Sequence, residues 1–294
     1  MSETRVTPNG SAAAAVRGAA LSQVAEAVRA LRTARPSAEQ VHIARKAIKK
    51  SRAALRLLRA TLAKVTYQRE NQALRAAAHA LDPVRDATVL LRALTELRAR
   101  RATLTRDRTT ATLTRSLQQR QRQAQHDLRS RPERLAAARS TLDQVQARAR
   151  RWHVGHDGWT SLGPAFRRIY RRGRRAAQHA ERRADAPTLH DWRKQIQYLR
   201  HAWQILEPLQ SKIPAKAAHR ARQVAEYLGE DHDLALLRAA TSEFTRQHHL
   251  NATALLAAID RRRKHLQTRA MPIGRHLYVR RSRRVAARLI EGRS

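Results

Sequence analysis

Two segments of the chain carry histidine and basic side chains at a spacing that suits the binding of an anion. An α-helix advances about 100° per residue, so residues three, four and seven positions apart share one face. In residues 41–64, that face holds His42, Arg45, Lys46, Lys49 and Arg56. In residues 189–206, it holds His190, Arg193 and Lys194. Arginine can donate two parallel hydrogen bonds to phosphate oxygens, and histidine can donate one or two. The pattern therefore predicts two helices that bind phosphate groups.

Each of these helices needs an apolar face that fixes its orientation. The first carries Val41, Ala44, Ile48, Leu55 and Leu62, and the second carries Leu189, Trp192, Ile196, Leu199 and Trp203. Residues 41–64 contain no acidic residue, so the Glu–Lys pairs that usually relieve such a basic face are missing. We expect a bound anion to offset this repulsion. The alternative is an ordinary solvated helix face in an arginine-rich protein.

Two further segments are strongly basic. Residues 164–183 form an expected helix with three candidate phosphate contacts, Arg167, Arg171 and Arg174, and three further arginines, Arg168, Arg172 and Arg175. Tyr170 lies among them, and its hydroxyl could donate to a phosphate or the ring could belong to the core. A terminal helix is expected at 275–290, with more arginines.

The composition points in the same direction. The chain has 294 residues with 61 Lys and Arg against 23 Asp and Glu, a formal net charge of +38. Such an excess predicts a polyanionic partner, namely DNA, RNA, polyphosphate or an anionic membrane surface. Cysteine is absent, which excludes disulfides and thiolate chemistry. We find no signal peptide and no apolar stretch of about 18 residues, and so expect a soluble cytoplasmic protein.

The two basic helices belong to an internal repeat. His42, Arg45, Lys46 and Arg52 align with His190, Arg193, Lys194 and Arg200 at a constant offset of 148 residues. Leu81 and the pair Arg85-Asp86 align with Leu228 and His232-Asp233 at an offset of 147. This spacing indicates a duplicated domain rather than a short solenoid repeat. The repeated acids, Asp86 and Asp233, are expected in the first turns of their helices, where they could hold an arginine in place.

Helical periodicity dominates the chain and predicts an all-α fold. We expect four regions: a disordered N-terminus (1–16), a first helical half (17–151), a connecting loop rich in Gly and Trp (152–163) and a second helical half (164–294). Asp82 is expected to cap a helix that begins at Pro83. Gly229 is expected to end a helix, and Pro272 with Gly274 to precede the terminal one.

The two copies of the motif His-x-x-Arg-Lys, at 42–52 and 190–200, resemble the CHAD domain, the conserved histidine α-helical domain. The segments 81–86 and 228–233 are similar to a later element of that family, and the resemblance spans about 17–290. It implies two antiparallel four-helix bundles related by pseudo-twofold symmetry, association with polyphosphate granules, and no catalysis or cofactor. It also implies these polyphosphate ligands: His42, Arg45, Lys49, Arg52, His190, Arg193 and Arg200. Asp82 and Gln197 depart from the family pattern, because Gly is usual at the first position and a basic residue at the second.

Two alternative functions remain open at this point. Non-specific binding of DNA or RNA would follow from counterion release, although no DNA-reading motif is present and few aromatic residues could stack on bases. A metal-dependent phosphohydrolase is suggested by His-Asp dipeptides at 126–127, 156–157, 190–191 and 232–233. Such an enzyme needs several of these side chains to converge on one metal ion. The oligomeric state is left open.

Overall fold

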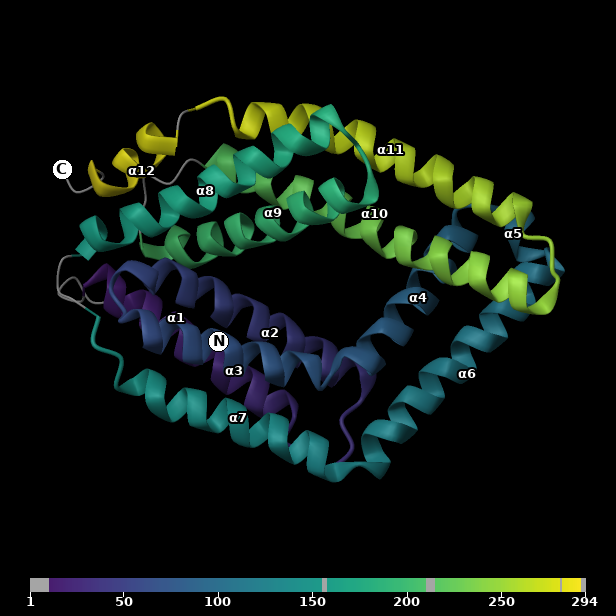
Figure 1. Cartoon of the computed structure of the whole chain (residues 1–294), viewed down its shortest axis with the longest axis horizontal. Coiled ribbons are helices and arrows are strands. Elements are labelled where there is room, and N and C mark those ends of the chain that lie inside the picture. Colours follow the sequence, from purple (N-terminus) through teal and green to yellow (C-terminus); the bar gives the residue numbers. More distant parts are fainter. Residues whose placement is uncertain (1–10, 155–157, 210–214, 281, 292–294) are drawn as a thin grey trace.

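The protein is described by a computed structural model that covers residues 11–154, 158–209, 215–280 and 282–291 (Figure 1). The first part of the chain contains α1 (Ala12–Ala30), α2 (Ala38–Leu57), α3 (Lys64–His79), α4 (Asp82–Ala99), α5 (Ala102–Thr105), α6 (Arg108–Ser130) and α7 (Pro132–Arg150). The second part contains α8 (Gly158–Arg182), α9 (Ala186–Leu206), α10 (Ala215–His248), α11 (Thr253–Leu277) and α12 (Ser282–Glu291). Short 3-10 turns follow α2 (Leu58–Ala60) and α9 (Glu207–Leu209). The described residues contain no strand, and the predicted all-α class is confirmed.

Local sequence signals fix where several helices begin. Ser37 caps α2 through a reciprocal capping box, in which its hydroxyl accepts from the Gln40 amide and the Gln40 side chain accepts from the Ser37 amide. The carboxylates of Asp107 and Asp185 cap α6 and α9 in the same sense, each accepting from a backbone amide three residues on. The caps at Ser37 and Asp185 therefore fix the first residues of α2 and α9, the two helices that carry the repeated motif and that we call the motif helices.

A large core joins the first helices of both halves. It combines buried Ala, Leu and Val of α1, α2, α3 and α7 with aromatic residues of α8 and α9. Phe166 of α8 contacts Trp203 of α9 edge-to-face, with ring centroids 4.7 Å apart. Because α2 also packs against α9, the two motif helices lie side by side at the junction of the halves.

A second, smaller core lies at the other end of the molecule. There α4 and α6 pack with the last part of α10 and the first part of α11, and their leucines are buried together (Figure 1). Both cores contain helices from each half of the chain, so the halves share their cores. The grouping into two symmetry-related four-helix bundles remains a prediction.

Several expected boundaries were wrong. Residues 12–16 belong to α1 and are helical, so the expected disordered segment is too long, and residues 1–10 lie outside the described part. The expected connecting loop (152–163) is also too long, because α8 begins at Gly158 and buries Leu162 in the core. Residues 12–15 are alanines, the strongest helix formers, and Ala13 and Val16 are buried, so propensity and core contacts both favour the helix there. At the start of α8, burial of Leu162 extends the helix through a segment of weak propensity.

Gly229, expected to end a helix, and the pair Pro272 and Gly274, expected to precede one, all lie inside helices. α10 continues through Gly229, and α11 continues through Pro272 and Gly274. A Cβ atom at Gly274 would come within 2.4 Å of the Trp192 ring, so glycine is required there for the close approach of α11 to α9. In the described residues, no helix is long and apolar enough to cross a membrane.

Candidate anion-binding site

Two helix contacts assemble the candidate site from both halves. α2 packs against α9, and α4 packs against α10. They bring together a set of side chains that we call the basic cluster: Arg45 and Lys49 of α2, Arg85 of α4, His190 and Arg193 of α9, and His232 of α10. Four of these six residues were selected from the sequence, and they come from both copies of the repeat.

Lys49 lies at the centre of the basic cluster. The residue is accessible to solvent, yet protein atoms surround its ammonium group, and this burial lowers the pKa of Lys49 to about 8. The nearby charges of Arg193, Arg45 and Arg85 lower it further, while Asp233 opposes the shift. An ammonium group on which the charges of three guanidinium groups act is a place where an anion would be favoured.

Arg193 faces Lys49 from the other half of the chain. Burial lowers the pKa of Arg193, and the charge of Asp233 partly opposes that shift. Its Nε atom is buried, and it has no hydrogen-bond partner among the described residues. A buried donor without a partner is costly, and a phosphate oxygen could satisfy it.

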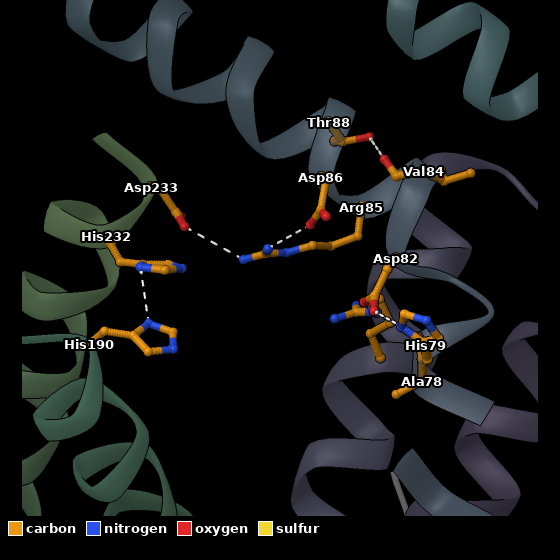
Figure 2. A network of polar contacts seen from close by, with 11 residues as sticks. Ala78, His79, Asp82, Val84, Arg85, Asp86, Thr88, His190, His232 and Asp233 are labelled. Atoms are coloured by element: carbon orange, nitrogen blue, oxygen red, sulfur yellow. Dashed lines mark hydrogen bonds and ion pairs between the residues drawn. The ribbon is translucent and has the colours of Figure 1, made fainter. Parts of the chain in front are cut away.

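Arg85 connects the two halves across the basic cluster. Its guanidinium donates to Asp86 at 2.8 Å and lies 3.6 Å from the carboxylate of Asp233 on α10 (Figure 2). The repeated acids thus hold an arginine, but it is Arg85 rather than an arginine of the two motif helices, and neither Asp86 in α4 nor Asp233 in the middle of α10 lies in a first turn. Arg85 was not among the site residues predicted from the sequence. The sequence signal that could have identified it is the repeat itself, because Arg85 precedes Asp86 just as His232 precedes Asp233.

Two histidines lie next to the cations. The Nδ1 atoms of His190 and His232 are 3.3 Å apart, and their rings are 4.7 Å apart (Figure 2). Burial lowers the pKa of His232 to about 3, and the charges of Arg193 and His190 add to the shift. Burial also lowers the pKa of His190. Both rings are therefore neutral at pH 7, and one ring nitrogen can donate to the other.

His42 occupies a different position from its repeat partner. It is exposed near the start of α2, and burial of its ring lowers its pKa, while Glu39 opposes this and Lys46 adds to it. The charges of Lys49, which belongs to the basic cluster, and of Arg92 on α4 also act on it. No described contact joins His42 to His190. The structure thus brings His190 into the cluster and places His42 at its edge, where the charges of both Lys49 and Arg92 act on it.

The expectation that the basic faces carry no compensating acid is wrong at Arg45. Its guanidinium donates to the carboxylate of Asp82 and, at 2.6 Å, to the carbonyl of Ala78. Asp82 does not cap α4 as expected, because Leu81 holds the N-cap position and the Asp82 carboxylate is turned toward Arg45 and His79. Asp82 is the first residue of α4, so a helical wheel of α2 alone could not reveal that it pairs with Arg45.

The other selected residues of α2 and α9 surround the cluster. Lys46 and Lys194 are exposed beside the histidines of their own helices. The guanidinium of Arg56 stacks on Tyr198 of α9 at 3.8 Å from the ring centroid. Arg52 donates to Asn71 at 3.3 Å, and burial lowers the pKa of Arg200.

The candidates on α8 do not join the cluster. Tyr170 is buried, and its hydroxyl lies 2.9 Å from the carbonyl of Leu277 and 3.1 Å from that of Arg280. It is therefore a core residue that ties α8 to the end of α11, and the expected phosphate contact is not supported. No described contact links Arg167, Arg171 or Arg174 to the basic cluster. In the described residues, no three His, Asp or Glu side chains are grouped so that they could hold a metal ion.

Comparison with known proteins identifies the family. The CHAD domain model matches residues 15–242, so the chain belongs to the CHAD domain family, which is linked to polyphosphate binding. The crystal structure of the CHAD domain from the plant Ricinus communis is similar, with a TM-score of 0.65 at 16% identity over 99% of this chain and 95% of that one. PptA from Streptomyces chartreusis has a TM-score of 0.62 at 17% identity over 92% and 98%. At these identities, the likeness supports the fold alone. The search of curated proteins returns no match.

Proposed function

We propose that the protein binds inorganic polyphosphate through the basic cluster and the cations that continue from it along α2 and α9. The observation that carries this proposal is the position of Lys49 and Arg193, which face each other from the two halves, with Asp233 as the acid whose charge acts on both. A linear chain of phosphates would offset their repulsion and supply acceptors for the unpartnered Nε of Arg193. The net charge of +38 and the family's link to polyphosphate support the same partner.

The test of this proposal is competition between two polyanions. Long-chain polyphosphate is expected to displace duplex DNA from the protein at equal phosphate concentration, while DNA displaces polyphosphate poorly. Fluorescence anisotropy with a labelled ligand, repeated at several salt concentrations, measures both orders, because such affinities depend steeply on salt. Displacement in the reverse order would favour a non-specific nucleic-acid-binding protein.

We propose binding without catalysis, in the cytoplasm and in association with polyphosphate granules. Support comes from the basic cluster, where cations and neutral imidazoles surround Lys49. The phosphohydrolase alternative predicts release of orthophosphate from polyphosphate when a divalent metal ion is added. A phosphate-release assay with Mg²⁺ or Mn²⁺ decides between them, and turnover would overturn the non-catalytic proposal.

The affinity for polyphosphate is expected to fall as the pH rises from 7 to 9.5. The pKa of free Lys49 is about 8, and a bound polyanion raises it, so the complex holds more protons than the free protein. Affinity is therefore lost as pH rises through about 8 and toward the bound value. The imidazole of His190 starts neutral, and a bound polyanion favours its protonated form, which adds affinity below pH 7.

Titration of the dissociation constant at constant ionic strength measures this profile. Lys49→Arg is the matched control, because it keeps the positive charge and removes the titration near pH 8. The variant should bind with a flatter profile between pH 7 and 9.5. A wild-type affinity that is constant over this interval contradicts the placement of Lys49 against the anion.

A further inference from the structure

The two copies of the repeat differ at one position beside their arginines. Arg45 and Arg193 are equivalent, since they are 148 residues apart. In the segment that follows, Asp82 and Gly229 are equivalent at the offset of 147 that also relates Asp86 to Asp233. The first half thus has a carboxylate where the second half has no side chain.

In the first half, that carboxylate binds one terminal nitrogen of the arginine, while the Nε atom of Arg45, like that of Arg193, has no partner among the described residues. Arg45 donates to one oxygen of Asp82, and the Nδ1 of His79 lies 2.7 Å from the other. The carbonyl of Ala78 takes a further bond from the same Arg45 nitrogen at 2.6 Å. The Arg45 side chain is only 12% exposed and that of Asp82 is 33% exposed, so this ion pair is largely shielded from water. An incoming anion must compete with Asp82 for Arg45.

In the second half, the corresponding space is open. His190 contacts His232, and the Gln197 side chain donates to the carbonyl of Ala225 at 3.3 Å. Because Arg193 lies between His190 and Gln197 on α9, these contacts place it against the part of α10 that contains Gly229. A Cβ atom at Gly229 would meet no heavy atom within 4 Å. The Gly229 position therefore offers Arg193 no carboxylate, and although the charge of Asp233 acts on Arg193, no ion pair joins the two in the described residues.

We propose that Asp82 is an internal competitor for Arg45, which makes the two halves unequal in anion binding. The proposal rests on the proposed function and specifies how its site works. Arg193 and Lys49 form the primary contact with phosphate, and Arg45 joins only when an anion displaces the carboxylate of Asp82. Charge-assisted hydrogen bonds are the strongest available to arginine, so this exchange sets a measurable limit on affinity.

Removal of the competitor is the first test. Asp82→Asn should tighten polyphosphate binding about 5- to 10-fold and steepen its logarithmic salt dependence by about 0.7, the value for one further phosphate contact on a single-stranded polyanion. Asp127→Asn is the matched control, because it removes the same charge from the same side of the molecule. Asp127 lines the cleft that Asp82 also lines, but its carboxylate accepts from Gln123 and contacts no arginine of the basic cluster. It should change the affinity by less than about twofold.

Transfer of the competitor to the second half is the converse test. Gly229→Asp places a carboxylate beside Arg193, and Gly229→Asn places an uncharged side chain of the same size there. Both fit the open space within α10. The aspartate variant should bind polyphosphate at least about 10-fold more weakly than the asparagine variant, since it would occupy the primary contact.

A double-mutant comparison tests whether Asp82 and Arg45 act on each other. Arg45→Ala should weaken binding about twofold in the wild type and about tenfold in the Asp82→Asn background, because only there is Arg45 available. An equal cost in both backgrounds, or an equal gain from Asp82→Asn and Asp127→Asn, would overturn the internal competition while the proposed function stands. A wild-type chain that binds no polyphosphate would overturn both.

Discussion

The double variant Lys49→Ala/Arg193→Ala is expected to bind long-chain polyphosphate at least about 100-fold more weakly than the wild type at physiological ionic strength. A hydrogen bond between a charged group and a phosphate contributes about 1.5–3 kcal/mol, and each 1.4 kcal/mol is a factor of ten in affinity. These two cations face each other from α2 and α9 and carry little compensating charge. Their loss should also reduce the salt dependence by about 1.4 units. Anisotropy titrations over a range of salt concentrations measure both quantities.

The control for this variant removes two charges elsewhere. Arg122 and Arg129 are exposed on α6, and Arg122→Ala/Arg129→Ala lowers the net charge by the same amount. It should weaken binding by only a few-fold through the long-range field of the protein. Thermal melting should show that the Lys49→Ala/Arg193→Ala variant remains folded, because its loss of two cations that repel each other offsets the loss of two cations near Asp233. Equal losses of affinity in the two double variants would mean that binding follows net charge rather than the basic cluster.

The local parts of this site could be predicted from the sequence. A helix wheel depends only on the 100° advance per residue, so the apolar faces of α2 and α9 and the cations beside them follow directly from their spacing. The repeat added the equivalence of Arg45 with Arg193. Lys49, Arg45, His190 and Arg193 were therefore selected before any contact between helices was known.

The remaining parts depend on contacts that no local pattern contains. Arg85 and His232 enter the basic cluster because α4 and α10 pack across the two halves. Asp82 neutralises Arg45 from a different helix, and the sequence could identify it only as a departure from the family pattern. Tyr170 and the arginines of α8 have a spacing that would suit phosphate binding. The hydroxyl of Tyr170 instead donates to a carbonyl at the end of α11. Which face of a helix is covered is a property of tertiary packing rather than of the helix itself.

The same reasoning applies to the helix boundaries. Propensity disfavours glycine within a helix by about 1 kcal/mol relative to alanine, and this predicted a helix end at Gly229. α10 nevertheless continues, because buried leucines on both sides of Gly229 anchor it in the two different cores. The cost of one glycine is small beside the burial of Leu228 and Leu234, each of which contributes roughly 1.5–3 kcal/mol.

The largest loss of stability is expected from Arg148→Ala. Glu70 of α3 is fully buried, and Arg148 of α7 binds its two carboxylate oxygens at 2.7 and 2.9 Å. Removal of one partner of a buried ion pair leaves a charge without compensation, which costs about 3–5 kcal/mol. Arg69 also donates to Glu70 at 2.9 Å, so the lower end of this range, about 3 kcal/mol, is expected. For a chain of this size, that corresponds to a fall in melting temperature of roughly 6–12 °C.

A double-mutant cycle separates this pair from general effects of truncation. Glu70→Gln keeps the shape of the side chain and removes its charge, so Arg148→Ala should cost much less in the Glu70→Gln background than in the wild type. Arg246, which pairs with Glu243 on the open surface, provides the comparison, and Arg246→Ala should leave the melting temperature unchanged. Equal costs of Arg148→Ala in both backgrounds would contradict a buried ion pair. Because this pair joins α3 to α7 and has no contact with the basic cluster, the stability of its variants should change without a change in polyphosphate affinity.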